Sequence, residues 1–290
     1  MGISRRTLLG GLAAFAGGAL TAVAGDKAAQ AITADSPLPL AGGYAPGTHS
    51  DRRTPPRHSH TSVRWSVDVS QKLVALTFDD GPMPRWTPQV LDMLDELKAP
   101  ATFFLVGERV RANARLIHGR LGRHEVANHT WSHLDMAKRD FGDLHRDLLR
   151  THVQIRTVTG REPTLLRPPY GHLGGSTVLA AAEFGYTVVL WSLQMLESVY
   201  VHHPAGLADY IAGAARPGTI LLAHDTGPED RLVAIRNLPR MITGLRQQGF
   251  ELVTVSDLLG AASESPAGPS ATGPSAEGES AAGHALGAPH

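Results

Sequence analysis

Between residues 66 and 259 the chain alternates short apolar runs with longer segments whose apolar residues recur every three or four positions. Short apolar runs bounded by polar or turn residues are typical of buried strands, and the longer period is typical of helices that bury one face. The predicted strands are residues 74–77, 102–106, 126–128, 164–166, 187–190, 220–223 and 251–253. The predicted helices are residues 87–97, 141–158, 176–184, 205–215 and 232–248.

Strands that alternate with helices predict a parallel sheet with helical crossovers, either open or closed into a barrel. Polar residues follow several of the predicted strands, each at its C-terminal end. They are Asp79-Asp80, Asn128-His129, Arg167, Trp191-Ser192 and His224-Asp225. Because functional groups of a (β/α) barrel converge on the rim formed by these ends, the pattern favours an α/β barrel of about seven parallel strands.

The segments on either side of this region have a different composition. Residues 1–31 contain Arg5-Arg6, a weakly apolar Gly/Ala-rich stretch and the small-residue site Ala29-Gln30-Ala31, which predict a twin-arginine export signal. A membrane anchor is the alternative, although the apolar stretch is short and glycine-rich for a spanning helix. Residues 32–65 are rich in Pro and Gly and predict a linker. Residues 260–290 are mostly Ala, Gly, Ser and Pro and predict a disordered tail.

The overall composition excludes several kinds of protein and site. Lys+Arg and Asp+Glu each number 27, so net charge gives no reason to expect a nucleic-acid or membrane-surface partner. The absence of cysteine from the sequence excludes disulfides and thiolate metal sites. Any zinc ion must therefore be held by histidine and carboxylate ligands.

The candidate chemistry lies in the sequence TFDDGP, which contains Asp79 and Asp80, and in NHTWSH, which contains His129 and His133. Two histidines four apart can face one point, as they do in metal-binding helical turns. One carboxylate and two imidazoles make three protein ligands and leave coordination positions free for water and substrate. The second carboxylate is then available as a general base beside the metal. This combination predicts a hydrolase.

TFDDGP, NHTWSH, the later RPPYG and a strand ending in Leu222-Ala-His224-Asp resemble the ordered motifs of the NodB-like polysaccharide deacetylases, carbohydrate esterase family 4. The resemblance covers residues 66–259. It implies the NodB homology fold, which is a distorted and incomplete (β/α) barrel, and a catalytic domain over these residues.

The resemblance also implies roles for individual residues. Asp80, His129 and His133 match the metal ligands, and Asp79 matches the catalytic base. Arg167 matches the arginine that orients this base and keeps it ionised. Tyr170 matches the residue whose backbone N–H helps to hold the oxyanion, and His224 matches the general acid that protonates the departing amine. The implied substrate-binding residues are Pro168, Tyr170, Trp191 and Leu222.

One segment departs from the family pattern. After the fifth predicted strand the family has a sequence like Trp-Ser-Val-Asp-x-x-Asp-Trp, whereas this chain has Gln194, Glu197 and Ser198 at the last three specified positions. The family carboxylates support the arginine and the acid histidine, so Gln194 and Glu197 are the candidate supporting residues here. The missing tryptophan removes an apolar surface for a sugar ring. We therefore expect this segment to affect rate and substrate more than metal binding.

These observations predict a secreted, metal-dependent hydrolase that removes N-acetyl groups from a peptidoglycan or chitin-type glycan and releases acetate. Zinc is the expected metal, with cobalt or nickel as alternatives. The expected partner is the N-acetylated polysaccharide, and we expect a monomer with no nucleic-acid or stable membrane partner.

Other interpretations stay open at this point. The altered segment at Gln194 and Glu197 is compatible with a glycan-binding domain of the same fold that has lost turnover. An O-deacetylase or a small-amide hydrolase of the same fold is a further alternative. Two histidines and a carboxylate further describe non-haem iron oxygenases, but those sites have no need of Asp79 or His224.

Overall fold

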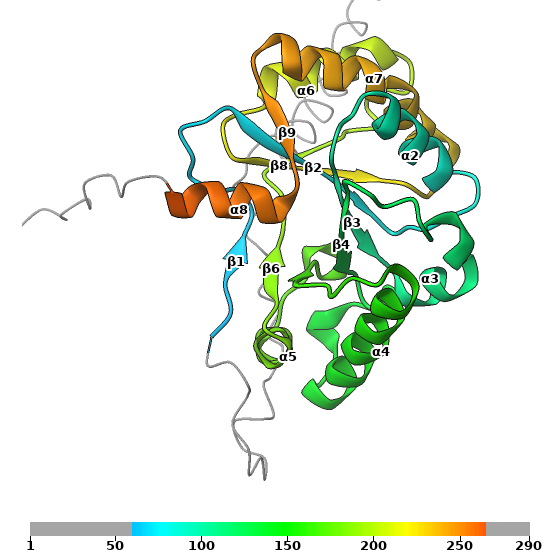
Figure 1. Ribbon diagram of the computed structural model, residues 1–290, viewed down its shortest axis with the longest axis vertical. Helices are drawn as coiled ribbons and strands as arrows, with labels where there is room; N and C mark the ends of the chain where they lie inside the picture. The colour runs from blue at the N-terminus through cyan, green and yellow to red at the C-terminus, as the bar shows by residue number, and fades with distance from the viewer. Residues whose placement is uncertain (1–59, 265–290) are drawn as a thin grey trace, which may run out of the picture.

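A computed structural model describes residues 60–264 as one α/β domain (Figure 1). The predicted export signal, most of the predicted linker and the tail from residue 265 onwards lie outside the described residues. Within residues 60–264 no helix has the length and apolar character needed to cross a bilayer.

The sheet has nine strands, and all the pairings between named strands are parallel. The strands are β1 Val63–Arg64, β2 Leu73–Asp79, β3 Thr102–Leu105, β4 Glu125–Asn128, β5 Leu165–Leu166, β6 Thr187–Val189, β7 Leu193–Gln194, β8 Thr219–His224 and β9 Glu251–Val253. Their order is β1-β6-β5-β4-β3-β2-β8-β7, with β9 paired to β2. The prediction of an incomplete (β/α) barrel is confirmed. All seven predicted strands are present, and β1 and β7 are two further short strands.

The helices that cover the sheet include all five predicted ones. They are α2 Thr87–Glu96, α3 Gly107–Asn113, α4 Phe141–Thr159, α5 Gly175–Phe184, α6 Pro204–Ala214, α7 Leu232–Gln247 and α8 Val255–Glu264. The sequence did not predict α3 and α8. Helix α3 has only seven residues, and α8 begins one residue after the last strand and runs into the Ala/Gly-rich segment, so neither shows a long apolar period.

The described secondary structure extends a few residues beyond the expected domain, residues 66–259, on both sides. Strand β1 lies in the expected linker and pairs with β6, where the Leu190 N–H donates to the Arg64 carbonyl at 2.6 Å. Helix α8 crosses the expected start of the tail at residue 260. Its residues Val255 and Leu258 are fully buried, and this burial stabilises a helix that extends into the Ala/Gly-rich segment.

Buried apolar residues form three clusters around the curved sheet. The largest lies between the sheet and helices α2, α6 and α7 and includes the stacked rings of Phe78 and Phe103. The second joins α4 and α5 to strands β5 and β6. The third contains apolar residues from alternate strand positions, and α8 covers it. The members from the strands are Ala75, Phe104, Ala127, Leu165, Val189 and Ile220.

Helix α8 begins at the end of the sheet opposite the candidate site. The Val255 N–H donates to Thr102 Oγ1 at 2.9 Å, and Thr102 is the first residue of β3. The candidate functional residues instead lie at or just after the last residues of β2, β4, β5 and β8. One rim is therefore packed by a helix, and the other carries the polar side chains.

Candidate active site

The parallel register brings the predicted site residues to one rim. Asp79 in β2 pairs with His224 in β8, and Asn128 in β4 pairs with Leu166 in β5. Asp80, His129 and Arg167 directly follow three of these paired positions. Side chains that are separated by up to 150 residues in the sequence therefore meet at the carboxyl ends of adjacent strands, as expected for this class of fold.

Asp80, His129 and His133 form a compact group of three ligand atoms, all within 4.8 Å of one another. Asp80 Oδ1 lies 3.0 Å from His133 Nε2 and 3.5 Å from His129 Nε2. The group is almost closed to solvent, since Asp80 and His129 are buried and only His133 is half-buried. The predicted candidate metal ligands are thus brought together at one point.

The two histidines reach this point from an irregular loop and not from a helical turn. Residues 129–135 contain neither helix nor strand. Thr130 and His133 have positive φ values of 67° and 57°. Of the five described non-glycine residues with positive φ, four lie in this site, the others being Asp80 and Tyr170. Such conformations cost free energy and are commonly concentrated at functional sites.

Hydrogen bonds to backbone carbonyls fix the orientation of His129 and Asp80. His129 Nδ1–H donates to the Arg167 carbonyl at 2.7 Å, which leaves the lone pair on Nε2 pointing at Asp80. On the other side, Arg109 Nη1 donates to the Asp80 carbonyl at 2.6 Å. Arg231 Nη1 lies 3.5 Å from Asp80 Oδ2. These contacts leave Oδ1 as the carboxylate oxygen that faces the two imidazoles.

Electrostatics make this point of the rim favourable for positive charge. Burial alone raises the pKa of Asp80, but the nearby His129 and His133 imidazoles lower it well below its usual range. Burial likewise lowers the pKa of His129, and the Asp79 and Asp80 carboxylates raise it above its ordinary value. The two carboxylates thus attract a cation to the space between the imidazoles.

The donor set fits a divalent metal ion. Asp80 Oδ1 is buried and accepts no hydrogen bond of normal geometry among the described residues, although it faces two imidazole nitrogens. A buried carboxylate oxygen without a hydrogen-bond partner is costly unless a cation binds it. One carboxylate and two imidazoles are ligands suited to zinc and to similar transition metals.

Asp79 belongs to a separate contact beside the same point. Arg167 Nη1 donates to Asp79 Oδ1 at 2.7 Å and to Thr77 Oγ1 at 2.8 Å. The other carboxylate oxygen, Asp79 Oδ2, lies 3.7 Å from His129 Nε2. Asp79 therefore has one oxygen bound to a guanidinium and one oxygen directed toward the candidate metal position.

Arg167 is held so that its guanidinium has little freedom to move. It is completely buried, and its Nε and Nη2 donate to the carbonyls of Val189 and Leu190. Its guanidinium carbon lies 3.9 Å from the centre of the Phe104 ring. A fully buried arginine with this many partners fixes the position and the charge of the carboxylate that it contacts.

His224 lies at the same rim, and Glu197 is its acidic neighbour. Glu197 Oε1 is 3.5 Å from His224 Nδ1, which is ion-pair distance without hydrogen-bond geometry. Gln194 instead accepts a hydrogen bond from Trp191 Nε1 at 3.2 Å. In the segment that departs from the family pattern, Glu197 thus supplies a carboxylate to His224. The Gln194 amide instead contacts Trp191 and not Arg167.

The predicted substrate-binding residues differ in their access to solvent. Tyr170 has 60% of its surface exposed, and its ring packs edge-on against His133 at 4.8 Å between centroids. Trp191 is half-buried. Pro168 is buried and Leu222 is only 5% exposed, so their side chains offer little surface to a sugar.

Sequence reasoning did not assign roles to several residues that support the site. Arg109 lies on the unpredicted helix α3, and Arg231 ends a short 3-10 helix, Glu229–Arg231, that contains no recognisable motif. Asp225 follows His224 and is fully buried, and it accepts a hydrogen bond from Thr87 Oγ1. Burial raises the pKa of Asp225 to about 7, and the charge of Asp80 contributes to this increase.

Asp225 also explains the glycine in TFDDGP. A Cβ atom at Gly81 would lie 2.3 Å from Asp225 Oδ2, which is far closer than any van der Waals contact. The Asp225 carboxyl therefore packs directly against the backbone that follows Asp80.

Comparison with protein families identifies the domain. Residues 66–189 match the family model described as polysaccharide deacetylase. A peptidoglycan N-acetylglucosamine deacetylase of Bacillus cereus is 38% identical over 199 residues, which cover 68% of this chain and 92% of that protein. A chitooligosaccharide deacetylase of Sinorhizobium fredii is 35% identical, and the match covers 61% of this chain and 87% of that protein.

Solved structures show the same fold. A peptidoglycan N-acetylglucosamine deacetylase in complex with 4-naphthalen-1-yl-N-oxidanyl-benzamide is 28% identical, with a TM-score of 0.64 over 68% of this chain and 92% of that chain. A family 4 carbohydrate esterase from Bacillus anthracis, described as a pseudoenzyme, is 25% identical, with a TM-score of 0.63 over 69% of each chain. The curled parallel sheet, the motifs and these relatives together show that the chain belongs to the polysaccharide deacetylase family, the NodB-like family 4 of carbohydrate esterases.

Proposed function

We propose that this protein is a metal-dependent N-deacetylase that acts on an N-acetylated glycan, with peptidoglycan as the first candidate substrate. The observation that carries the proposal is the position of Asp79, which is bound to Arg167 and directed toward the Asp80, His129 and His133 group. A metal site with a separate, oriented carboxylate supports hydrolysis. Relatives named as peptidoglycan and chitooligosaccharide deacetylases support the substrate class.

Asp80, His129 and His133 would hold the ion. A divalent metal bound there supplies Lewis acidity, which makes water a better nucleophile near neutral pH and polarises the acetamide oxygen. The contact from His129 Nδ1–H to the Arg167 carbonyl keeps Nε2 available as a ligand atom.

Asp79 would act as the general base through its oxygen Oδ2, because Oδ1 is engaged by Arg167. Removing a proton from the attacking water requires a carboxylate oxygen held toward the reacting point, and the contact of Oδ1 with the buried guanidinium of Arg167 gives Oδ2 that orientation. Arg167 would remain charged and would not take part in proton transfer.

Tyr170 and His224 would complete the reaction from the other side of the rim. The Tyr170 backbone N–H would donate to the oxyanion that develops when the carbonyl is attacked, a contact worth roughly 3 kcal/mol in comparable sites. His224 would give a proton to the amine nitrogen as it leaves, and Glu197 would stabilise the charged imidazole. The products are acetate and a free amino sugar.

Zinc is the metal we propose, because the ligands are one carboxylate and two imidazoles and the sequence contains no thiolate. We also propose that the protein acts outside the cytoplasm. The Arg5-Arg6 signal in residues 1–31 supports export, and a cell-wall glycan is accessible to an exported enzyme.

The second candidate function is glycan binding without turnover. Two observations favour it: Gln194 contacts Trp191 and does not support Arg167, and a family member with the same fold is described as a pseudoenzyme. The Asp79–Arg167 contact and the Glu197 carboxylate beside His224 favour the enzyme.

Acetate release from peptidoglycan and from N-acetylglucosamine oligomers tests the proposal. The protein is first treated with a chelator and then assayed with and without added zinc, with Asp79→Asn as the matched inactive control. We expect release that depends on the metal and is lost in the control. A protein that retains one metal ion per chain, binds glycan and yet releases no acetate would instead be a binding domain.

A further inference from the structure

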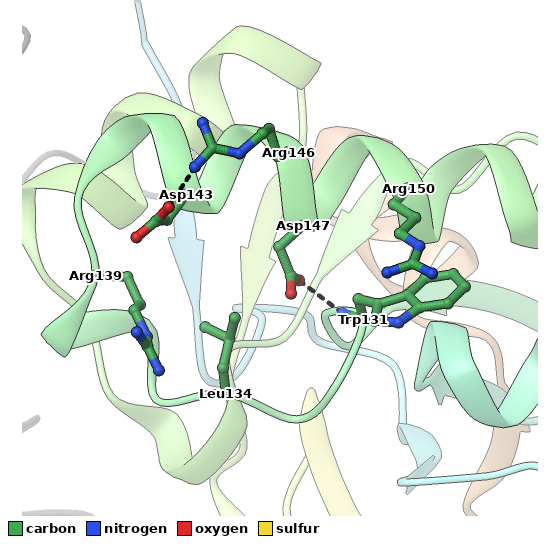
Figure 2. Close-up of a pocket in the computed structure, with 7 residues that line it drawn as sticks. All are labelled: Trp131, Leu134, Arg139, Asp143, Arg146, Asp147 and Arg150. Carbon is green, nitrogen blue, oxygen red and sulfur yellow. Dashed lines mark hydrogen bonds and ion pairs between the residues drawn. The ribbon is translucent and has the colours of Figure 1, made fainter.

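A pocket lies beside the loop that carries His129 and His133. It has a volume of about 460 Å³ and is lined by Trp131 and Leu134 from that loop, together with three arginines and two aspartates from the start of α4 and the residues before it (Figure 2). An adjoining hollow of about 410 Å³ shares Trp131, Arg146 and Arg150 and extends to Arg111 on α3. No step of the proposed reaction uses this region.

The pocket has an excess of positive charge. Asp143 is paired with Arg146, and Asp147 accepts a hydrogen bond from the Trp131 backbone N–H at 2.6 Å. Arg111, Arg139 and Arg150 are exposed and have no ion-pair partner within residues 60–264. Arg139 lines the first of the two adjoining hollows, Arg111 lines the second and Arg150 lines both. Burial raises the pKa of Asp147 to about 6, and the nearby Arg150 and Arg139 oppose this increase, so Asp147 offsets only part of the positive charge. The remaining charge attracts an anion, in a chain whose overall net charge is zero.

Arg150 is already arranged to receive such an anion. Its guanidinium carbon lies 3.6 Å from the centre of the Trp131 ring, and that of Arg111 lies 5.3 Å from the same ring. Figure 2 shows the Arg150 guanidinium lying over the indole. A stacked guanidinium keeps its N–H edge available and loses little freedom when it binds a carboxylate.

The pocket and the candidate metal group are connected by one short segment. Trp131 is two residues from both His129 and His133, so its Cα lies at most about 7 Å from the Cα of either histidine. Its carbonyl accepts a hydrogen bond from the Glu108 N–H at 3.0 Å, and its N–H is held by Asp147. One segment, residues 129–134, therefore carries both histidines and two residues of the pocket lining, and a glycan that extends along this segment from the rim would reach the pocket.

We propose that the Trp131 pocket binds a carboxylate carried by the glycan, so that the preferred substrate is an anionic N-acetylated glycan and not a neutral one. Arg139 and Arg150 contact the carboxylate, and Arg111 adds long-range attraction. This inference rests on the proposed deacetylase function for its substrate, but the pocket binds the carboxylate whether or not turnover occurs.

The test compares two substrates on the zinc-loaded protein. One is a peptidoglycan fragment with free peptide carboxylates, and the other is the same fragment with those carboxylates converted to methyl amides. We expect Arg139→Gln and Arg150→Gln each to lower kcat/KM on the charged fragment by roughly 10-fold, through KM, and to leave the amidated fragment within about 2-fold of wild type. Arg236→Gln, an exposed arginine on α7, makes the same charge change outside the pocket and is the control.

A binding measurement tests the pocket independently of the proposed deacetylase activity. Calorimetry with N-acetylmuramoyl dipeptide and the chelated protein should show binding that weakens in both pocket variants and at higher salt. If the wild-type protein releases no acetate from any glycan but still binds this ligand through Arg139 and Arg150, the pocket is supported and the deacetylase proposal fails.

Equal losses on the charged and amidated fragments would overturn the inference, as would unchanged binding of the dipeptide. Arg139 does not stack on Trp131. A loss of affinity in Arg139→Gln therefore reports lost anion binding and not a displaced indole ring. Thermal unfolding of each variant checks that Arg150→Gln has not simply loosened the loop.

Discussion

Arg167 donates a hydrogen bond from Nη1 to Asp79 Oδ1 at 2.7 Å, and this contact is closed to solvent because Arg167 is completely buried and Asp79 is only 4% exposed. The contact lies beside the candidate metal group and does not form part of it. This geometry separates two functions of the rim, which are holding a cation and holding a charged base. The separation can be tested by changing one function at a time.

Replacing Arg167 with lysine should impair turnover without removing the metal. Lysine keeps the positive charge but cannot make the four side-chain contacts of the guanidinium, so Asp79 loses its alignment. We expect kcat to fall by about 10- to 100-fold. Metal affinity should stay near wild type, because His129 is held by the backbone carbonyl of residue 167. Zinc titration beside acetate-release kinetics measures both, and loss of metal in this variant would contradict the separation.

Substitutions should also distinguish the general base, Asp79, from the metal ligands. Asp79→Asn should keep one zinc per chain and lower kcat by about 10²- to 10⁴-fold, because a general base is lost. His129→Ala should lose the metal itself, since it removes one of three ligands. Metal content by elemental analysis gives the comparison. Equal metal loss in the two variants would mean that Asp79 is a ligand and not a base.

Glu197 should act on His224 rather than on the metal. Its carboxylate lies 3.5 Å from His224 Nδ1 and stabilises the charged imidazole that would protonate the leaving amine. We expect Glu197→Gln to lower kcat by about 10-fold, with unchanged KM and metal content. Gln194→Asp is the matched control for Glu197→Gln. It also changes the charge of this segment, but at a side chain that contacts Trp191 and not His224. An unchanged kcat in Glu197→Gln would show that this carboxylate does not support the acid.

The sequence predicted those parts of the fold that depend on local apolar patterns. Each of the seven predicted strands buries apolar residues at successive or alternate positions, and the motif residues follow directly from the strand ends. The residues Asp79, Asp80, Arg167 and His224 could be assigned to one rim because parallel strands fix their ends together. The residue roles remain predictions, and the structure supplies the distances on which their tests depend.

The parts that sequence could not predict are set by long-range contacts. The loop of His129 and His133 depends on Asn128, whose side chain contacts the Leu148 carbonyl, the Tyr186 hydroxyl and the Thr130 N–H. The positive φ values at Thr130 and His133 follow from such tertiary contacts and have no glycine to reveal them. Arg231 reaches Asp80 across 151 positions without any sequence pattern.

His124 should make the domain sensitive to acid, away from the candidate site. Its side chain is buried against Phe103, and both ring nitrogens lack hydrogen-bond partners within the described residues. Burial lowers the pKa of His124 from 6.5 to about 4, although the Asp95 carboxylate opposes this change. Between pH 6.5 and pH 4 the unfolded chain therefore binds a proton at this position that the folded chain does not.

The free energy of unfolding should consequently decrease as the pH falls through this window, by about 3 kcal/mol for this residue. His124→Leu removes the titrating group and no hydrogen bond, so its melting temperature should fall less than that of the wild type between pH 7 and pH 4.5. His202, an exposed histidine, provides the control substitution His202→Leu. Thermal unfolding followed by circular dichroism at several pH values makes the comparison. If the wild type and His124→Leu lose melting temperature in parallel, the buried imidazole is not the acid-sensitive group, and the aspartates of the domain would have to account for the loss.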